Sequence, residues 1–484
     1  MYTSNLLDIF KSFSPKEIKE FEEFVSSPYY NKNKNVIELF NILKNEYPKF
    51  DKDSLHKEVL YKKIYKGTKY NDATMRTLIF YLQEVAEKFL AVKNFENNRF
   101  ASKSHLLLEL NERDLDKLFA KDFRLAEKEF AKIKKRTVDF YYYKFVIEFE
   151  NLYNHNKIHY DRDEKYMNKF NLHEIFGNLT AYYLLRIYRF YLYSLNMSMK
   201  FNIKHPIKLF GELVSTHNPN DYEDAPLINM YYYCLLLTLK PEEEENYFKA
   251  KKLLSEHEKD FEEIDVNEFY INLENYCKRR NRAGRKEFIN ELYEILKAEL
   301  INKAYMFRGY MPDLYYKGLF DTAMRLKEYD FAKKFIIDYK DELPEQFREN
   351  TFLQCMAIYE FVTDNFEKAL ELISKVKFDE IYQKLDVKCL TNAIYYELDF
   401  TPSLEASIDT FRHFIKNDKL AAPFRKESYS NFNKNLLRLH KLRKKPEIKK
   451  LLELQEDTEQ NITYNKEWML AKIKQLIEKE QSTH

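Results

Sequence analysis

Glycine is rare in this sequence, and its rarity restricts the possible folds more than any other feature. The chain has 484 residues and only 6 glycines. Folds that bind phosphate groups with backbone loops, and folds with many tight hairpins, need glycine because it adopts positive φ angles at little cost. No two of these glycines lie close enough together to form a GxGxxG or GxxxxGK motif. The sequence therefore argues against a nucleotide-binding α/β fold and against a β-rich fold.

Proline and hydrophobic residues together favour helices. The 12 prolines leave residues 49–205 without one, so long helices can run uninterrupted there. Hydrophobic residues make up 45% of the chain and charged residues 33%, a balance that excludes wholesale disorder. The 39 Tyr and 39 Phe supply ample material for a core. We predict an all-α protein, either globular or built from stacked repeats.

The ends and the apolar runs of the chain indicate its compartment. The start, MYTSNLLDIF, lacks the basic segment and the cleavage site of a signal peptide. The longest apolar run, residues 227–239, is too short to span a bilayer. The four cysteines lie far apart without a CxxC motif. We therefore predict a soluble cytoplasmic protein that does not enter membranes and whose cysteines are reduced core thiols.

Residues 1–97 contain unusually explicit signals for helix starts. In FSPKEI, Ser14 can cap a helix, Pro15 occupies its first position, and Glu17 can complete a capping box. A second helix is expected after a cap at Asn35, a third across SLHKEVLYKKIY, and a fourth from about Asp72. We predict an N-terminal helical bundle over residues 1–97.

A repeated pattern of residues appears after residue 225. Three segments share an aromatic residue or Leu, a small residue three positions later, and apolar residues seven and ten positions later. They are Tyr329, Ala332, Ile336 and Tyr339; Phe366, Ala369, Ile373 and Val376; and Leu404, Ser407, Phe411 and Phe414. The small residues lie 37 and 38 positions apart, a period close to that of helix-pair repeats. Another apolar segment precedes each of the three, so we predict successive pairs of helices over residues 226–416.

The segment NMYYYCLLLTL, residues 229–239, shows no alternation of apolar and polar residues. We interpret it as the first helix of such a pair, buried on most of its circumference between its partner and the preceding repeat. A buried strand remains the alternative, because periodicity alone does not distinguish a strand from a helix in a lone apolar run.

The pattern resembles the tetratricopeptide (TPR) class of helical repeats. The segment NFEKALELI, residues 365–373, carries the resemblance most clearly, although the Trp, Leu and Gly of a standard first helix are missing or scattered. The resemblance implies a right-handed α-solenoid of helix pairs over residues 226–416, with a long-helix TPR-like region over residues 105–216. Residues 420–484 are interpreted as C-terminal capping helices, with NKEWMLAKIKQLIEK as an amphipathic cap.

The resemblance also implies a function and a binding surface. TPR-like proteins are usually non-enzymatic scaffolds or adaptors that bind a protein or peptide along the groove lined by their first helices. The polar side chains that project between core positions here are Asn275, Lys278, Arg279, Lys317, Asp321, Arg325, Gln354 and Asn392. Because stacking brings equivalent positions into register, such residues should face one ligand. Members that hold a C-terminal carboxylate use a Lys and an Asn, and Asp321 stands where the Asn is needed, which argues against that ligand.

Two basic segments support an alternative function. Residues 278–286 hold six basic residues, and residues 425–450 hold ten Lys or Arg against two Glu. Basic segments with interleaved aromatic residues can bind nucleic-acid backbones and stack on bases. The whole chain has 80 basic and 78 acidic residues, a net charge of only +2. Nucleic-acid or ribonucleoprotein binding is therefore the alternative to protein binding.

No motif in the chain indicates catalysis, a cofactor or a metal. His155 and His159 have the spacing of two metal ligands on a helix, but Asn156 stands where a metalloprotease has Glu. We interpret both as ordinary surface or helix-end histidines. The sequence predicts a protein that is not an enzyme.

Overall fold

The computed structural model describes residues 4–50, 55–159, 172–201, 210–306, 309–377, 381–418, 421 and 423–482. Every regular element in these residues is a helix and none is a strand, so the prediction of an all-α fold is confirmed. Contacts between residues divide the chain into two units, Met1–Arg189 and Phe190–His484. The division falls within helix α10 (Leu172–Phe201), inside the predicted long-helix region. The predicted four-part organisation stays a prediction.

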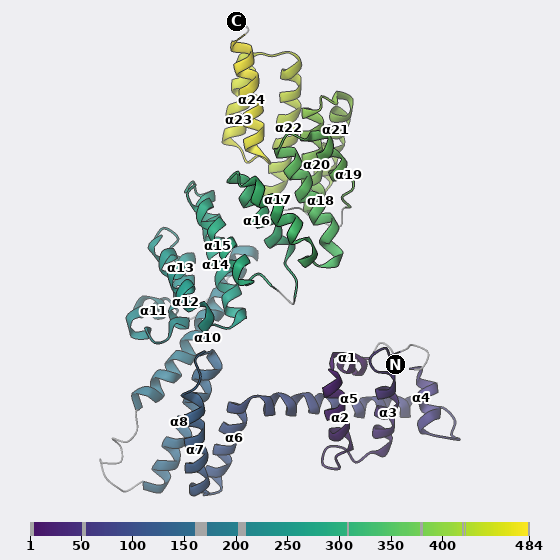
Figure 1. The fold of residues 1–484 in the computed structure, drawn as a ribbon, viewed down its shortest axis with the longest axis vertical. Coiled ribbons are helices and arrows are strands. Elements are labelled where there is room, and N and C mark those ends of the chain that lie inside the picture. The colour runs from purple at the N-terminus through teal and green to yellow at the C-terminus, as the bar shows by residue number, and fades with distance from the viewer. Residues whose placement is uncertain are drawn as a thin grey trace. The chain divides into compact units, whose positions relative to one another are not determined.

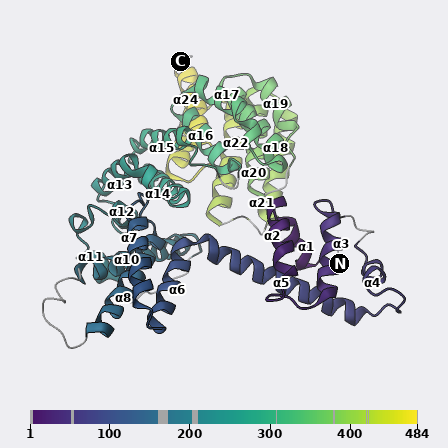
Figure 2. The same ribbon diagram turned by 60° about the horizontal axis from the view of Figure 1, so that its bottom comes forward.

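The first unit begins with five helices that share one apolar core (Figure 1). They are α1 (Asn5–Ser12), α2 (Pro15–Ser26), α3 (Lys34–Glu46), α4 (Lys57–Ile64) and α5 (Asp72–Asn97). Helix α5 contacts each of the other four, and Figure 2 also shows them gathered along it. The Phe21 ring sits at the centre, with the rings of Phe10, Phe40 and Phe89 between 5.0 and 5.4 Å from it.

The helix starts in this bundle follow local sequence signals. The capping box predicted at Ser14 is present: its hydroxyl accepts a hydrogen bond from the Glu17 backbone N–H, and the Glu17 carboxylate accepts one from the Ser14 backbone N–H. The cap predicted at Asn35 was placed two residues too late. Helix α3 is capped by Asn33, whose side chain accepts a hydrogen bond from the Asn35 backbone N–H.

A second group of helices completes the first unit. They are α6 (Arg99–Glu112), α7 (Asp116–Phe130), α8 (Val138–His159) and the first part of α10. Helix α6 packs against α5, α7 and α8. A small core of Leu107, Phe119, Ala126 and Ile147 joins α6, α7 and α8.

The second unit consists of a long series of packed helices. They are α11 (Phe210–Thr216), α12 (Pro226–Leu239), α13 (Glu245–His257), α14 (Glu263–Arg282), α15 (Phe288–Asn302), α16 (Asp313–Arg325), α17 (Tyr329–Asp338), α18 (Glu345–Val362), α19 (Phe366–Ser374), α20 (Ile381–Glu397), α21 (Thr401–Asn417), α22 (Pro423–Lys444), α23 (Ile448–Gln460) and α24 (Lys466–Gln481), after the last part of α10. Short 3₁₀ turns lie at Pro219–Tyr222, Glu258–Asp260 and Lys340–Glu342.

Contacts in this unit follow a regular order from α12 onward. Each helix packs against the next one in the chain. Helix α12 also contacts α14, α16 contacts α18, α18 contacts α20, and α20 contacts α22. Two of the three small residues of the repeated pattern, Ala332 and Ala369, are completely buried, and the third, Ser407, is partly buried. The last helices, α22, α23 and α24, pack against one another.

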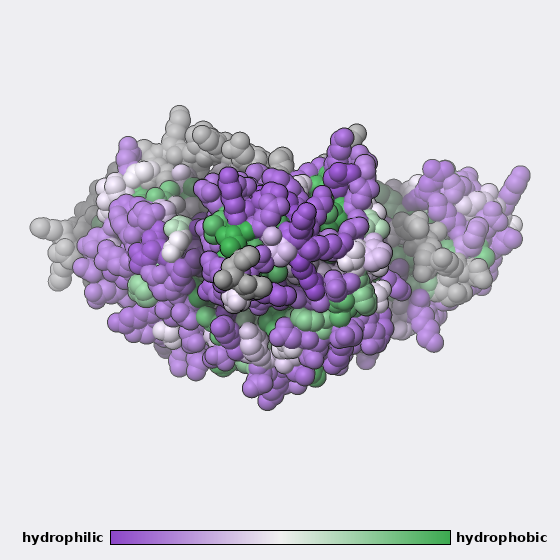
Figure 3. All heavy atoms as spheres, turned by 90° about the horizontal axis from the view of Figure 1, so that it is seen from above, coloured by the Kyte–Doolittle hydropathy of each residue, from purple (hydrophilic) through white to green (hydrophobic). Residues whose placement is uncertain are grey.

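Residues 229–239 belong to helix α12, so the strand alternative is wrong. The side chains of Met230, Tyr231, Cys234 and Leu235 are fully buried. Burial on several sides of the helix explains why the sequence lacks an amphipathic period there. Among the described residues, no helix is both long and apolar enough to cross a membrane. On the face drawn in Figure 3, hydrophilic side chains dominate and hydrophobic ones form small, separate patches.

Candidate functional site

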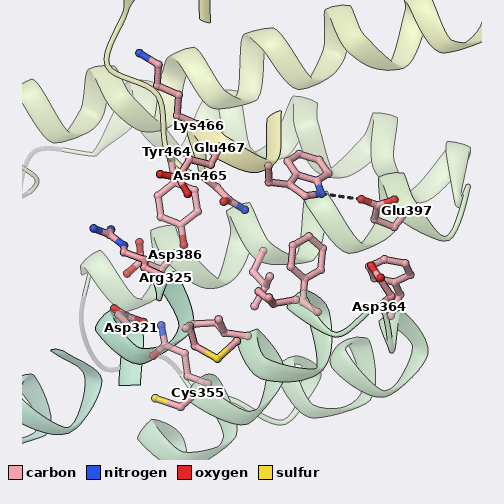
Figure 4. A pocket seen from close by; sticks show the side chains of 18 of the residues that line it. Asp321, Arg325, Cys355, Asp364, Asp386, Glu397, Tyr464, Asn465, Lys466 and Glu467 are labelled. Atoms are coloured by element: carbon pink, nitrogen blue, oxygen red, sulfur yellow. Dashed lines mark hydrogen bonds between the residues drawn. The ribbon is translucent and has the colours of Figure 1, made fainter. Parts of the chain in front are cut away.

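A cavity of about 720 Å³ lies in the second unit, among helices α16, α18, α20 and α24. Helix α16 contributes Lys317, Asp321 and Arg325 to its lining, and α18 contributes Gln354 and Ile358. Helix α20 adds Asp386, Leu390 and Glu397, and the start of α24 with the loop before it adds Tyr464, Trp468 and Lys472. Figure 4 shows Asp321, Arg325 and Asp386 together on one side of the cavity and Glu397 and Asp364 on the other.

The spacing of residues along α16 explains how this helix lines the cavity. Lys317, Asp321 and Arg325 lie four positions apart and so share one face of the helix. The opposite faces carry Tyr316, Phe320 and other residues that are buried against neighbouring helices. Packing of the apolar faces therefore fixes which polar side chains point into the cavity.

Four of the eight predicted groove residues line this cavity. They are Lys317, Asp321 and Arg325 from α16 and Gln354 from α18. The two helices are in direct contact. Residues from the first helices of two successive helix pairs therefore lie together at this cavity.

The other four predicted residues lie elsewhere. Asn275 is exposed on α14, where the Lys278 ammonium pairs with the Glu274 carboxylate at 2.5 Å and the Arg279 guanidinium donates to the Leu237 carbonyl at 3.0 Å. None of these three lines the cavity.

Asn392 is completely buried on α20. Its amide group accepts a hydrogen bond from the Ser407 hydroxyl at 2.5 Å and donates one to Asn433 at 3.4 Å. These contacts give Asn392 a role in helix packing, and it cannot reach a ligand in this arrangement.

Enclosure by the helices changes the acidity of the carboxyl groups on one side of the cavity. Water of the cavity reaches the exposed Asp321 side chain, but the protein around it raises its pKa to about 6; Asp386 adds to this rise, and Arg325 and Lys317 oppose it. Burial also raises the pKa of Asp386, against the effect of the Tyr429 hydroxyl, which donates a hydrogen bond to it at 2.6 Å.

The other side of the cavity is built around Trp468, the only tryptophan in the chain. Its indole N–H donates to the Glu397 carboxylate at 2.7 Å, and the Lys472 ammonium pairs with the same carboxylate at 2.8 Å. The indole ring lies 6.0 Å from the Phe361 ring and 5.7 Å from the Tyr396 ring. The start of α24 is therefore held firmly in the cavity wall.

Asp386, Tyr464 and Trp468 line the cavity but are absent from the predicted groove residues. Helix α20 begins at Ile381, eight residues before the apolar segment CLTNAIYYEL that precedes the third copy of the repeated pattern. Extending the helical period upstream of Cys389 would have placed Asp386 on the helix. Tyr464 and Trp468 come from the segment predicted as a cap, and the repeat period gives no signal that this segment reaches the cavity.

Three of the six basic residues of segment 278–286 form ion pairs with acidic residues. The Arg280 guanidinium is buried and contacts the Glu242 and Glu244 carboxylates, both at 2.6 Å. Arg285 pairs with Glu244 at 3.0 Å and with Glu287 at 2.7 Å. The acidic run after Pro241 thus neutralises much of the charge of this segment.

The second basic segment, 425–450, also forms ion pairs with its neighbours. Arg438 pairs with Asp457 at 2.7 Å, and Lys444 pairs with Glu405 at 3.1 Å. The Arg443 guanidinium donates to the Tyr396 carbonyl at 2.6 Å. Much of the positive charge of α22 therefore supports contacts between helices.

The four cysteines of the chain lie in the described residues, and none is placed as a reactive thiol. Cys234, Cys277, Cys355 and Cys389 are all free and buried, as predicted, and burial raises the pKa of the Cys355 thiol well above its usual value. The described residues contain no group of three or more His, Cys, Asp or Glu arranged to hold a metal ion.

Comparisons with protein-family models, with curated proteins and with solved structures find no match to this chain. The functional argument therefore depends on the chain's own residues.

Proposed function

We propose that this chain is a non-enzymatic cytoplasmic scaffold or adaptor that binds a protein or peptide partner in the cavity between α16, α18, α20 and α24. The observation that carries the proposal is the convergence of Lys317, Asp321, Arg325 and Gln354 on one cavity. They are four of the eight polar residues that the resemblance to TPR repeats implies should face a common ligand.

The proposal includes a TPR-like right-handed α-solenoid over residues 226–416. The order of contacts supports it, because helices packed against both the next helix and the next but one are expected from stacked helix pairs. The burial of Ala332 and Ala369 supports it as well, since a small residue lets two helices approach closely.

The lining of the cavity suits a peptide. Its volume of about 720 Å³ falls within the range of about 300–1,000 Å³ typical of ligand sites. Charged groups of both signs lie beside aromatic rings, so the wall offers both orientation and apolar contact. By contrast, many basic residues of 278–286 and 425–450 are already paired with carboxylates, which favours protein binding over nucleic-acid binding.

Affinity capture with a charge-reversed variant tests the proposal. Partners are captured on the full chain, identified by mass spectrometry and then bound in purified form. Lys317→Glu with Arg325→Glu should abolish capture and leave the melting temperature nearly unchanged, because Arg325 is exposed and the partly buried Lys317 loses only one ion pair, with Asp313 on the same helix.

A matched control makes the same change in net charge at another place in the second unit. Lys441 and Lys445 are exposed on or just after α22, within the second basic segment. Lys441→Glu with Lys445→Glu should leave capture intact. Loss of capture in this control, with normal capture by the α16 variant, would instead place the binding site in the basic segment.

A further inference from the structure

Three polar groups of the cavity form no hydrogen bond and no close ion pair with the described part of the chain. Within the described residues, Asp321 and Arg325 form no hydrogen bond and no close ion pair. Gln354 is only 7% exposed, and its side-chain oxygen Oε1 is buried without a hydrogen-bond partner. A buried polar atom without a partner is costly. Of the three groups, the Gln354 side-chain oxygen would therefore be stabilised most by a ligand that donates a hydrogen bond to it.

The charged neighbours of these groups are already engaged. Lys317 pairs with Asp313 at 3.1 Å, Asp386 accepts from the Tyr429 hydroxyl, and Glu397 accepts from Trp468 and pairs with Lys472. Lys327, Asp364 and Glu467 elsewhere in the lining also form no ion pair with any described residue, but the groups left for recognition beside Lys317 and Asp386 are one carboxylate, one guanidinium and one amide oxygen. A ligand that matches them carries a cation, an anion and a hydrogen-bond donor.

The spacing of the two charged residues sets a length scale for that ligand. Asp321 and Arg325 are four positions apart on α16, which separates their Cβ atoms by about 5–6 Å. In an extended peptide, side chains two positions apart point to the same side and are separated by about 6.4–6.8 Å. An extended segment with opposite charges two residues apart therefore matches the pair.

We propose that the cavity binds an extended peptide segment whose acidic side chain meets Arg325, whose basic side chain, two residues away, meets Asp321, and whose backbone N–H donates to Gln354. The inference rests on the proposed function and specifies the partner's chemistry. Arg325 can hold a carboxylate through two parallel N–H donors. A polyanion is disfavoured, because it would bring further negative charge beside Asp321 and Asp386.

Three capped peptides of identical composition test the spacing. Leu-Glu-Ala-Lys-Leu and Leu-Lys-Ala-Glu-Leu place the charges two residues apart in either chain direction, and Leu-Ala-Glu-Lys-Leu places them side by side. Binding to the full chain is followed by the fluorescence of Trp468, which lines the cavity. One of the spaced peptides should bind about tenfold more tightly than the adjacent one, as expected for one charge contact. Equal binding of all three, or binding of none, would overturn the inference.

An exchange of the two charges identifies the residues involved. Asp321→Arg with Arg325→Asp keeps the net charge and the spacing but reverses the direction of the pair. The preferred peptide should then change from one charge order to the other. An unchanged order of preference would overturn the assignment to these two residues.

Failure of this inference is distinguishable from failure of the proposed function. If a captured partner depends on Lys317 and Arg325 but the three peptides do not differ, the binding site stands and the proposed ligand chemistry is wrong. If the spaced peptide binds but no protein partner depends on α16, the cavity recognises this charge pattern and the proposed function is wrong.

Discussion

The N-terminal bundle and the helices from α12 onward are both helical, but their cores differ in polarity. The core of α1 to α5 is apolar, and none of the described residues up to Asn97 is a buried polar or charged one. Between α12 and α23 the interior includes many polar side chains. They include Asp265, Glu274, Arg280, Glu299, Gln354, Glu360, Asn392, Asn433, Asn435 and His440.

The two regions also differ in how their helices begin. In the bundle, Ser14, Asn33 and Asn71 each accept a hydrogen bond from the first turn of the helix that follows. Helices α12 to α19 start without any such side-chain cap. Helices α1 and α4 of the bundle have no such cap. Local signals therefore define three of the five bundle helices, whereas packing against neighbours defines α12 to α19.

The difference in polarity has a functional consequence. An apolar core needs only complementary shapes, but a buried polar group must find a partner. In the second unit most such groups are satisfied within the chain, but Arg280 Nε, Glu299 Oε2, Asn435 Oδ1 and Gln354 Oε1 are not, and of these four residues only Gln354 lines the cavity. The polar interior is thus where a binding site can arise, and the following experiments test the comparison in order of decreasing effect.

A charge forced into the packed interface between helices should have the largest effect. Ala369 is completely buried on α19, so Ala369→Glu should lower the free energy of unfolding by about 3–5 kcal/mol, because the new carboxylate has no partner. Urea unfolding followed by Trp468 fluorescence measures the loss within the same unit.

The matched control for this variant lies two residues away on the same helix. Glu367 is exposed, and Glu367→Ala should change stability by less than about 0.5 kcal/mol. Equal midpoints for the two variants would show that Ala369 does not lie between packed helices.

Removal of a buried hydrogen-bonded side chain should have an intermediate effect. The Asn433 amide donates to the Ile408 carbonyl at 2.8 Å, and its oxygen accepts from Asn392 at 3.4 Å. Asn433→Ala leaves these partners unsatisfied and should cost about 2 kcal/mol, measured in the same urea experiment. Asn417→Ala, at an exposed position on α21, should have almost no effect. Equal losses would mean that the polar interior is no more sensitive than the surface.

Asn392 also shows how far the sequence determines the site. Helix content, the capping box at Ser14 and the burial of Ala369 follow from local patterns, and all three were predicted correctly. Asn392 and Gln354 were both expected to project into a groove, but Asn392 is sealed between helices and Gln354 lines the cavity. A polar residue on a helix buried on most sides can point toward another helix or toward a ligand, and the sequence pattern does not distinguish the two.

Other features depend on contacts between distant parts of the chain. The pairing of Arg280 with Glu242 and Glu244, and the position of Trp468 beside Glu397, join residues far apart in sequence. No local period encodes such contacts. The basic segment 278–286 consequently looked available for nucleic acid, although part of its charge is neutralised in the fold.

Mild acid should weaken peptide binding at the cavity about tenfold. In free energy this is a smaller effect than the one expected for Asn433→Ala. The pKa of Asp321 is raised to about 6 by desolvation from the protein around it and by Asp386, with Arg325 and Lys317 opposing. The carboxylate that holds the basic side chain is therefore charged at pH 7 and mostly protonated at pH 5, and at one unit below the pKa about a tenth remains ionised. Titration of Leu-Glu-Ala-Lys-Leu and its reversed peptide at both values measures the change.

Mild acid should stabilise the fold while it weakens peptide binding, and this difference separates the two roles of Asp321. A raised folded-state pKa means that the folded chain binds this proton more readily than the unfolded chain, so protonation between pH 7 and pH 5 favours the fold. Asp321→Asn should remove most of the pH dependence of binding. Persistence of the full pH dependence in that variant would show that another group is responsible.

Loss of a single helix cap should have the smallest effect, and it tests the other side of the comparison. Ser14→Ala removes the hydroxyl that accepts from the Glu17 backbone N–H, but it keeps the bond from the backbone N–H of residue 14 to the Glu17 carboxylate. The expected cost is about 1 kcal/mol, seen as faster hydrogen exchange in α1 to α5. Ser26→Ala is the same chemical change at an exposed position at the end of α2 and should leave exchange unchanged. Since α12 to α19 have no cap of this kind to lose, their stability depends on packing, whereas the bundle should respond to this local change. Identical exchange in the two serine variants would mean that packing alone also defines the helices of the bundle, and the contrast between the two regions would then reduce to the polarity of their cores.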